Sequence, residues 1–258
     1  MLDMTQIESY YPEQLRPFRK NILREYLQYK ILEIIFTSTF ANSLRFMGGT
    51  AIRIAHAGTR FSEDLDFDNR SLDKVGFEKL SGLIAKRFTL EGYEVDVKNT
   101  IRTAFRSSVR ISGILQEAGI SRHRDEKLTI QIDAEPQDFD YKPQSIIINK
   151  FGIFTRIHAV PVDILLAQKI ACIFTRKRAM GRDFYDIIYL MGKTNPNMDY
   201  IGNKLGINSG AVLKKRIIRR CRDLDFRVLS KDLAPFLINP SDSVKIISFS
   251  DYISTIEF

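Results

Sequence analysis

The feature that most constrains this chain is a pair of glycines between two short regular segments. Leu44–Met47, apolar apart from Arg45, is predicted to be a short strand, Gly48 and Gly49 follow it, and Thr50–Ala57 is predicted to be a helix that stops at Gly58. Glycines at the end of a strand let the backbone come close to a bound group, and the free amides of the next helix attract an anion. The order of strand, tight turn and helix therefore predicts a phosphate site at the glycines and Thr50. A plain turn capped by a threonine is the alternative.

A short acidic segment follows that helix and supplies a second chemical signal. In Asp64–Asp68 every other residue is an aspartate, so an extended segment places the aspartates on one face and Leu65 and Phe67 in the core. Carboxylates held side by side are unstable unless a cation neutralises them, and hard oxygen ligands suit Mg²⁺ or Mn²⁺. Asp64 and Asp66 are therefore predicted to be catalytic metal ligands. The alternative is an exposed strand with an acidic face.

A third carboxylate usually completes such a site, and the alternation of a later strand suggests where it lies. In Leu128–Ala134 the apolar residues alternate and form a buried face, which leaves Asp133 on the polar face at the strand's end. Asp133 is predicted to be the third metal ligand and a catalytic residue. Glu135 has the same parity and is the second choice, and Asp96 is the third. A residue that only ends an edge strand is the alternative for Asp133.

The remaining periodicity divides the chain into a mixed half and a helical half. The predicted elements are helices at Pro17–Phe36, about Gly76–Glu91, Asp163 towards Met191 and, as a pair, within Asn197–Asp223, with further strands at Tyr93–Lys98, Ser107–Leu115 and Leu128–Ala134. No strand is evident for some eighty residues after the helix that begins at Pro161. The fold class is therefore α+β, with one domain at residues 1–157 that carries both motifs and a helical domain at 158–258.

Two parts of the sequence resemble a known family. Phe46–Arg53 and Arg60–Phe67 resemble the first motif of the AbiEii/AbiGii-type nucleotidyltransferase toxins, a branch of the DNA polymerase beta superfamily. Asp163–Lys169, continuing through Arg176 to Arg182–Asp186, resembles that family's helical motif of a lysine, an arginine and an Arg-Asp-x-x-Asp ending. The resemblance spans about residues 44 to 190. It implies a polymerase-beta-like mixed sheet followed by a helical C-terminal lobe, in an enzyme that uses an NTP.

The resemblance also implies roles for single residues. Lys169 would contact the triphosphate, and Asp183 or Asp186 would orient Lys169 or Arg182 or complete the catalytic site. Without the family, Lys169 is a surface lysine and the two aspartates are helix-surface charges. Arg60 and Ser62, which precede the acidic segment, would bind phosphate or cap a turn. The predicted nucleotide-binding residues are Gly48, Gly49, Thr50, Arg60, Ser62, Lys169, Arg182 and Asp183, and the predicted catalytic residues are Asp64, Asp66, Asp133, Lys169 and Asp186.

The charge of the chain bears on its partner. Its net charge is +8, which favours a phosphate-rich partner because neutralising phosphates releases counterions. Leu213–Arg222 reads as a helix with cations over most of its surface, which either grips an RNA backbone or is a solvated helix face. The resemblance implies a toxin with a cognate antitoxin that transfers nucleotides from an NTP to RNA, at the tRNA 3′ end, and blocks translation.

Two other functions are consistent with the same residues. The first keeps the transfer chemistry but moves the acceptor to a protein hydroxyl or a small molecule. The second is a non-catalytic module that binds a nucleotide or an antitoxin. The loss of one paired acid would favour that module, yet Asp64 and Asp66 are both present.

The sequence also bears on the cellular compartment. Residues 1–8 hold no apolar run that could serve as a signal peptide, and charges interrupt every apolar run well short of a membrane span. Cys172 and Cys221 lack zinc-ligand spacing and are expected to be reduced core or near-core thiols. We therefore expect a soluble cytoplasmic protein with no membrane partner.

Overall fold

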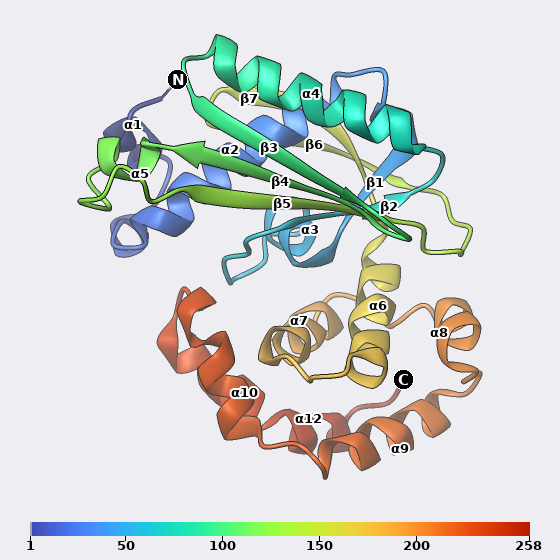
Figure 1. Cartoon of the computed structure of the whole chain (residues 1–258). Helices are drawn as coiled ribbons and strands as arrows, with labels where there is room; N and C mark the ends of the chain where they lie inside the picture. Colours follow the sequence, from blue (N-terminus) through green and yellow to red (C-terminus); the bar gives the residue numbers. More distant parts are fainter. Residues whose placement is uncertain (1) are drawn as a thin grey trace. The chain divides into compact units, whose positions relative to one another are not determined.

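The computed structural model describes residues 2–258 and separates them into two compact units (Figure 1). The sheet unit consists of the chain up to Ala55, Phe61–Asp138 and Pro143–Ala159. The helical unit consists of His56–Arg60, Phe139–Lys142 and Val160–Phe258. No helix in residues 2–258 is long and apolar enough to cross a membrane.

The sheet unit is built on one mixed sheet. Its strands lie in the order β3-β4-β5-β2-β1-β7-β6. β2 runs parallel to β5, β1 runs parallel to β7, and the other neighbours are antiparallel. The strands are β1 (Leu44–Met47), β2 (Leu65–Asn69), β3 (Glu94–Ile101), β4 (Phe105–Ser112), β5 (Leu128–Glu135), β6 (Gln144–Lys150) and β7 (Ile153–Ala159). The helices are α1 (Met4–Ser9), α2 (Arg19–Phe36), α3 (Gly48–Ala55), α4 (Lys74–Leu90) and α5 (Ile114–Glu117). The predicted α+β class is confirmed.

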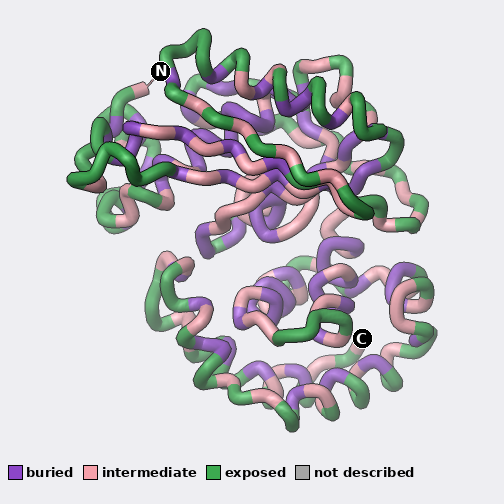
Figure 2. The backbone as a smooth tube through the Cα atoms, viewed as in Figure 1, coloured by how far each residue is buried: buried purple, intermediate pink, exposed green. Residues whose placement is uncertain are grey.

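Helices α2 and α4 pack against each other and against the sheet (Figure 1). The buried residues of α4 recur at helical spacing, at Phe77, Leu80, Ile84 and Phe88, so one stripe of the helix meets the sheet and the other faces water. Figure 2 shows this contrast along α4 as purple and green. On the strands, Phe67 meets Phe36 of α2 at a ring-centroid distance of 6.3 Å, so the core lies between α2 and this face of the sheet.

The opposite face of the central strands is polar. Because side chains alternate along a strand, burial of Leu65 and Phe67 places Asp66 on the other face of β2. In β5 the buried residues likewise alternate with half-buried ones, and Asp133 is one of the half-buried set. Asp66 and Asp133 therefore lie on the polar face, as the sequence predicts.

The helical unit packs α6 (Val162–Thr175) against α7 (Gly181–Met191). Phe184 of α7 lies 4.8 Å from Phe249, measured between ring centroids, and anchors a small aromatic core. The other helices are α8 (Met198–Leu205), α9 (Gly210–Cys221), α10 (Phe226–Leu233), α11 (Ser243–Ile247) and α12 (Phe249–Thr255). The predicted helix pair within Asn197–Asp223 corresponds to α8 and α9. Both cysteines are free thiols, Cys221 buried and Cys172 half-buried.

Three observations correct the sequence reading. β2 and β5 are interior strands of the sheet. The alternative of an exposed strand for Asp64–Asp68 and the alternative of an edge strand for Asp133 are therefore both wrong. Asp68 is fully buried, with its carboxylate 3.0 Å from the backbone nitrogen of Gln137, so it does not share an open face with Asp66. The hairpin β6–β7 has no counterpart among the predicted strands.

Candidate functional site

The turn between β1 and α3 brings a carboxylate against the backbone. Gly48 has φ +77°, a conformation that side-chain-bearing residues rarely adopt. A Cβ added to Gly48 would overlap the carboxylate of Asp66. The sequence predicts that this glycine makes room for a phosphate, whereas in the structure the adjacent space holds Asp66. Gly48 therefore sets the position of a predicted metal ligand as well as the start of α3.

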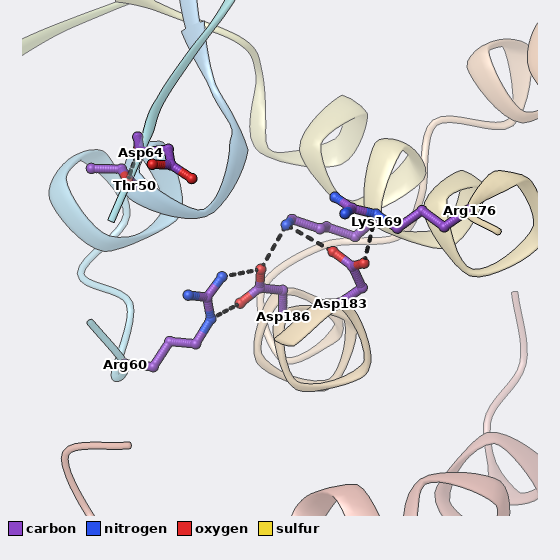
Figure 3. Close-up of polar contacts among 7 residues, drawn as sticks. All are labelled: Thr50, Arg60, Asp64, Lys169, Arg176, Asp183 and Asp186. Carbon is purple, nitrogen blue, oxygen red and sulfur yellow. Dashed lines mark hydrogen bonds and ion pairs between the residues drawn. The ribbon is translucent and has the colours of Figure 1, made fainter. Parts of the chain in front are cut away.

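The loop that carries Asp64 is fixed from two sides. Thr50, fully buried in α3, donates its hydroxyl hydrogen to the backbone carbonyl of Asp64 (Figure 3). Gln28 of α2 donates from Nε2 to the backbone carbonyls of Ser62 at 3.1 Å and Glu63 at 2.9 Å. Asp64 lies just before β2 and not within it. The hydroxyl of Thr50 thus bonds a loop rather than capping its helix.

The sheet register brings two of the three predicted acids together. Asp66 on β2 is the register partner of Asp133 on β5, and adjacent strands lie about 4.8 Å apart. Glu135 is paired with the buried Asp68 instead. Asp96 lies on β3, two strands beyond β5. Of the three choices for the third carboxylate, Asp133 is therefore the one beside Asp66, and its catalytic role stays a prediction.

Arg106 of β4 is a site residue that the sequence reading missed. Its Nε lies 2.6 Å from Oδ1 of Asp133 and its terminal nitrogen lies 2.9 Å from Oδ2. The hydrogen bond and charge of Asp133 raise the pKa of Arg106, and the charges of Asp64 and Asp66 add to the effect. Strand alternation could have placed Arg106 on the polar face, but only the register of β4 with β5 pairs it with Asp133.

The carboxylates of Asp64, Asp66 and Asp133 are suitable ligands for a divalent cation, but their positions in the structure are less suitable. Three carboxylates offer the hard oxygen ligands that Mg²⁺ and Mn²⁺ prefer. Among residues 2–258, however, no three His, Cys, Asp or Glu side chains are grouped so as to hold a metal ion. Both carboxylate oxygens of Asp133 are bound by Arg106. A cation would therefore require Asp133 to leave this ion pair.

The helical unit contains a buried cluster of charges (Figure 3). Nζ of Lys169 on α6 lies 3.1 Å from Asp183 and 2.9 Å from Asp186, both on α7. The lysine side chain is 9% exposed and the aspartates are 1% and 2% exposed. Surface roles for these three residues are therefore wrong. The prediction that the aspartates orient Lys169 agrees with these contacts, while a triphosphate contact by Lys169 stays a prediction.

Two arginines complete the cluster. Arg60 binds Asp186 through two nitrogens, each at 2.7 Å, and Nε of Arg176 lies 3.0 Å from Asp183. Burial alone would raise the pKa of Asp186, but Arg60 and Lys169 outweigh it and hold that pKa below its ordinary value. Burial alone would lower the pKa of Lys169, but Asp186 and Asp183 hold it above its ordinary value. Asp186 and Lys169 are therefore both charged at neutral pH.

The other predicted nucleotide-binding residues differ in their surroundings. Arg182, beside Asp183, is half-buried, and no ion pair of its side chain occurs within the part of the chain that the structure describes. The carbonyl of Ser62 accepts the bond from Gln28 described above. Arg60 is 3% exposed, so it acts first as the partner of Asp186. Phosphate contacts by Arg60, Ser62 and Arg182 stay predictions.

The chain combines a mixed sheet, two aspartates that are register partners near a Gly-Gly turn, and a unit of helices. Two solved structures from Helicobacter pylori have a similar fold. JHP933 is 16% identical with a TM-score of 0.55, over 90% of this chain and 91% of its own. A candidate nucleotidyltransferase is 17% identical with a TM-score of 0.58, over 94% of this chain and 96% of its own. No curated protein sequence matches the chain.

The family follows from the sequence model that the chain matches. The model of the nucleotidyl transferase AbiEii toxin of type IV toxin–antitoxin systems matches residues 30–244. Since this range is most of the chain, the protein belongs to the AbiEii nucleotidyltransferase toxin family. The resemblance seen in the two sequence motifs is thereby confirmed, and the protein is a nucleotidyltransferase.

Proposed function

We propose that this protein transfers a nucleotide from an NTP to RNA, at the tRNA 3′ end, and thereby blocks translation. The observation that carries the proposal is the pairing of Asp66 with Asp133 beside the Gly48 turn. Asp66 lies against Gly48, the first residue of the eight-residue helix α3, and the free amides at a helix N-terminus favour a triphosphate. The AbiEii family supplies the toxin context.

The chain's own residues would hold the reactants. A Mg²⁺ or Mn²⁺ ion bound by Asp64, Asp66 and Asp133 would activate the attacking hydroxyl and neutralise charge on the leaving phosphate. Gly48 keeps the carboxylate of Asp66 against the backbone. Thr50 holds the carbonyl of Asp64 and so fixes the direction of that loop. These contacts orient the acids before any substrate binds, which lowers the cost of assembling the site.

Lys169 is inferred to supply positive charge to the triphosphate. Its ammonium group is kept protonated by Asp183 and Asp186, which hold its pKa high. A fixed cation of this kind stabilises the charge that develops on phosphate oxygens during transfer.

Helix α9 supports RNA as the acceptor. Lys215 and Arg219 of α9 and Arg222, its C-cap residue, are exposed, and they lie at helical spacing along one side. Leu213, Ile217 and Cys221 are the buried residues of the same helix. No ion pair engages those three exposed cations within residues 2–258. A row of unpaired cations on a rigid helix fits the regular phosphates of a nucleic-acid backbone.

The direct test is a transfer assay with labelled NTPs. The protein is incubated with each α-³²P-labelled NTP, Mg²⁺, total RNA and total protein, and the RNA and protein pools are then separated. Label in the tRNA fraction, sensitive to removal of 3′ nucleotides, is expected. Label in the protein pool alone would replace RNA with a protein hydroxyl as the acceptor. Transfer in wild type and none in Asp66→Ala would establish the site.

A growth assay tests the toxin role. Induced expression in a bacterial host is expected to stop growth, and Asp66→Ala is expected to restore it while the protein stays folded. Asp96→Ala is the matched control, because Asp96 is an exposed acid on the distant strand β3. This control should remain toxic. Equal toxicity of wild type and Asp66→Ala would contradict catalysis. Co-expression of the cognate antitoxin is expected to rescue growth.

A further inference from the structure

Three charged side chains form a row across the polar face of the sheet. Arg106 on β4 is the register partner of Asp133 on β5, and Asp133 is the register partner of Asp66 on β2. The side chain of Arg106 is 56% exposed and that of Asp133 is 26% exposed. The guanidinium group therefore lies beside the predicted metal ligands while remaining open to solvent.

The geometry of this ion pair bears on metal binding. The two nitrogens of Arg106 lie 2.6 and 2.9 Å from the two oxygens of Asp133, a bidentate contact that occupies both atoms. A divalent cation binds carboxylates through the same oxygen lone pairs. A guanidinium group at this position would also repel the cation. Arg106 and a cation therefore cannot both use Asp133 fully.

We propose that Arg106 is a positioning residue that competes with the divalent cation for Asp133. Without a cation, Arg106 neutralises part of the charge that Asp66 and Asp133 bring together, which keeps the acids in place. When a cation binds, Arg106 releases Asp133 and turns towards solvent, where its exposure leaves it free to move. This inference rests on the proposed function, because it requires Asp66 and Asp133 to be metal ligands.

The burial of the pair sets the expected size of the effect. A partly exposed ion pair contributes modestly to stability, and a bidentate arginine contact is stronger than a single one. Removing the positive charge also ends its repulsion of the cation. We therefore expect removal of Arg106 to tighten cation binding by about three- to tenfold.

The experiment measures binding of Mn²⁺ alone to the full chain. Free Mn²⁺ is followed by electron paramagnetic resonance in wild type, Arg106→Gln and Arg106→Lys. We expect about three- to tenfold tighter binding in Arg106→Gln. Arg106→Lys should lie between the two, because lysine keeps the charge but cannot form the bidentate contact. Circular dichroism melting confirms that each variant is folded, as expected for an exposed side chain.

The matched control is Arg110→Gln. Arg110 lies four residues along the same strand, is 37% exposed and pairs across the sheet with Asp96 at 3.5 Å. Its substitution changes the net charge of the protein by the same amount and removes a comparable ion pair away from Asp133. The affinity for Mn²⁺ should stay within about twofold of wild type, since only long-range charge is altered.

The outcomes separate this inference from the proposed function. Wild type that binds Mn²⁺, with weaker binding in Asp66→Asn and unchanged or weaker binding in Arg106→Gln, would overturn the competition and leave the metal site standing. Tightening of equal size in Arg110→Gln would assign the effect to net charge and also overturn it. Wild type that binds no Mn²⁺, or Asp66→Asn that binds as tightly as wild type, would overturn both proposals.

Discussion

At the scale of single residues, the position of Gly48 is set by two independent restraints. Its positive φ is strained for any residue with a side chain, and its missing Cβ leaves the space into which the Asp66 carboxylate fits. A residue with a side chain would have to shift either the turn or the acid. The conformation of this turn and the position of the Asp66 carboxylate therefore both depend on Gly48.

Gly48→Ala is expected to lower both stability and transfer activity. The strained backbone and the overlap with Asp66 should cost at least about 2 kcal/mol, and displacement of the acid should reduce transfer by more than tenfold. Urea unfolding followed by circular dichroism and the labelled-NTP assay measure the two effects. Gly82→Ala is the control, because its Cβ meets nothing within 4 Å and it lies within α4. That change should be neutral or slightly stabilising.

Also at this scale, Asp186 pairs with two positively charged side chains, Arg60 and Lys169, in the helical unit. Asp186→Asn leaves Lys169 and Arg60 without their shared carboxylate, and breaking such a buried pair typically costs about 3–5 kcal/mol. Urea unfolding at neutral pH measures this loss. Asp251→Asn, an exposed acid on α12, should change stability little, and equal losses in the two variants would contradict a structural role for the cluster.

The carboxyl group of Asp186 also predicts that the protein loses stability at low pH. The pKa of Asp186 is depressed in the folded protein, so its contribution is complete above the unfolded value of about 4 and is lost as the pH falls below that. The pKa of Lys169 is raised, so its contribution is complete below about pH 10 and is lost at higher pH. Unfolding midpoints between pH 3 and 7 should therefore fall more steeply in wild type than in Asp186→Asn.

At the scale of elements, the β6–β7 hairpin supplies an anchor for the N-terminal helices. Its two-residue turn, Phe151–Gly152, has φ of +59° and +75°, which suits a tight hairpin turn. The ring of Phe151 is 4% exposed and contacts Tyr10, Tyr11, Tyr26 and Tyr29. A residue under backbone strain is therefore held by its side-chain packing.

Phe151→Asn separates backbone strain from packing. Asparagine tolerates positive φ better, but loss of the buried ring should cost about 3–5 kcal/mol and dominate. Phe154→Asn on β7 is the matched control, because that ring is 68% exposed, and it should change stability by less than about 0.5 kcal/mol. Urea unfolding compares the two. Stabilisation by Phe151→Asn would show that the turn strain outweighs the aromatic cluster.

At the scale of the whole molecule, the excess of positive charge gives an expected salt dependence of RNA binding. Substitution of Lys215, Arg219 and Arg222 by glutamine should weaken tRNA binding. The slope of the logarithm of the binding constant against the logarithm of the salt concentration should become shallower by about 1 for each phosphate that α9 no longer neutralises. Lys74, Lys79 and Lys86, exposed on α4, give the charge-matched control triple. Filter binding at several salt concentrations measures both. Equal effects of the two triples would assign the binding to net charge rather than to α9.

The division of the molecule also belongs to this scale. The family match, residues 30–244, includes parts of both compact units. Two short segments, 56–60 and 139–142, group with the helical unit although the sheet unit surrounds them in sequence. One of these segments brings Arg60 to Asp186. The domain division at residues 157 and 158 stays a prediction.

The sequence by itself determined the elements that carry a strong local pattern. Helices α2 and α4, predicted at Pro17–Phe36 and about Gly76–Glu91, follow from periodicity, as do the strand Leu44–Met47 and the alternation around Asp133. Periodicity depends only on neighbouring residues. The β6–β7 hairpin was missed because its first strand, Gln144–Lys150, has three consecutive isoleucines in place of alternation. The two-residue turn before Ile153 was the available signal.

Only the tertiary structure decided which charges meet. The glycines and aspartates of the first motif were visible in the sequence, but the contact of Gly48 with Asp66 and the ion pair of Arg106 with Asp133 depend on strand register. Register is a relation between distant segments, and it is set by the burial of one whole face rather than by any local pattern. For the same reason, the sequence identified Lys169 while the packing of α6 on α7 gave it its two carboxylate partners.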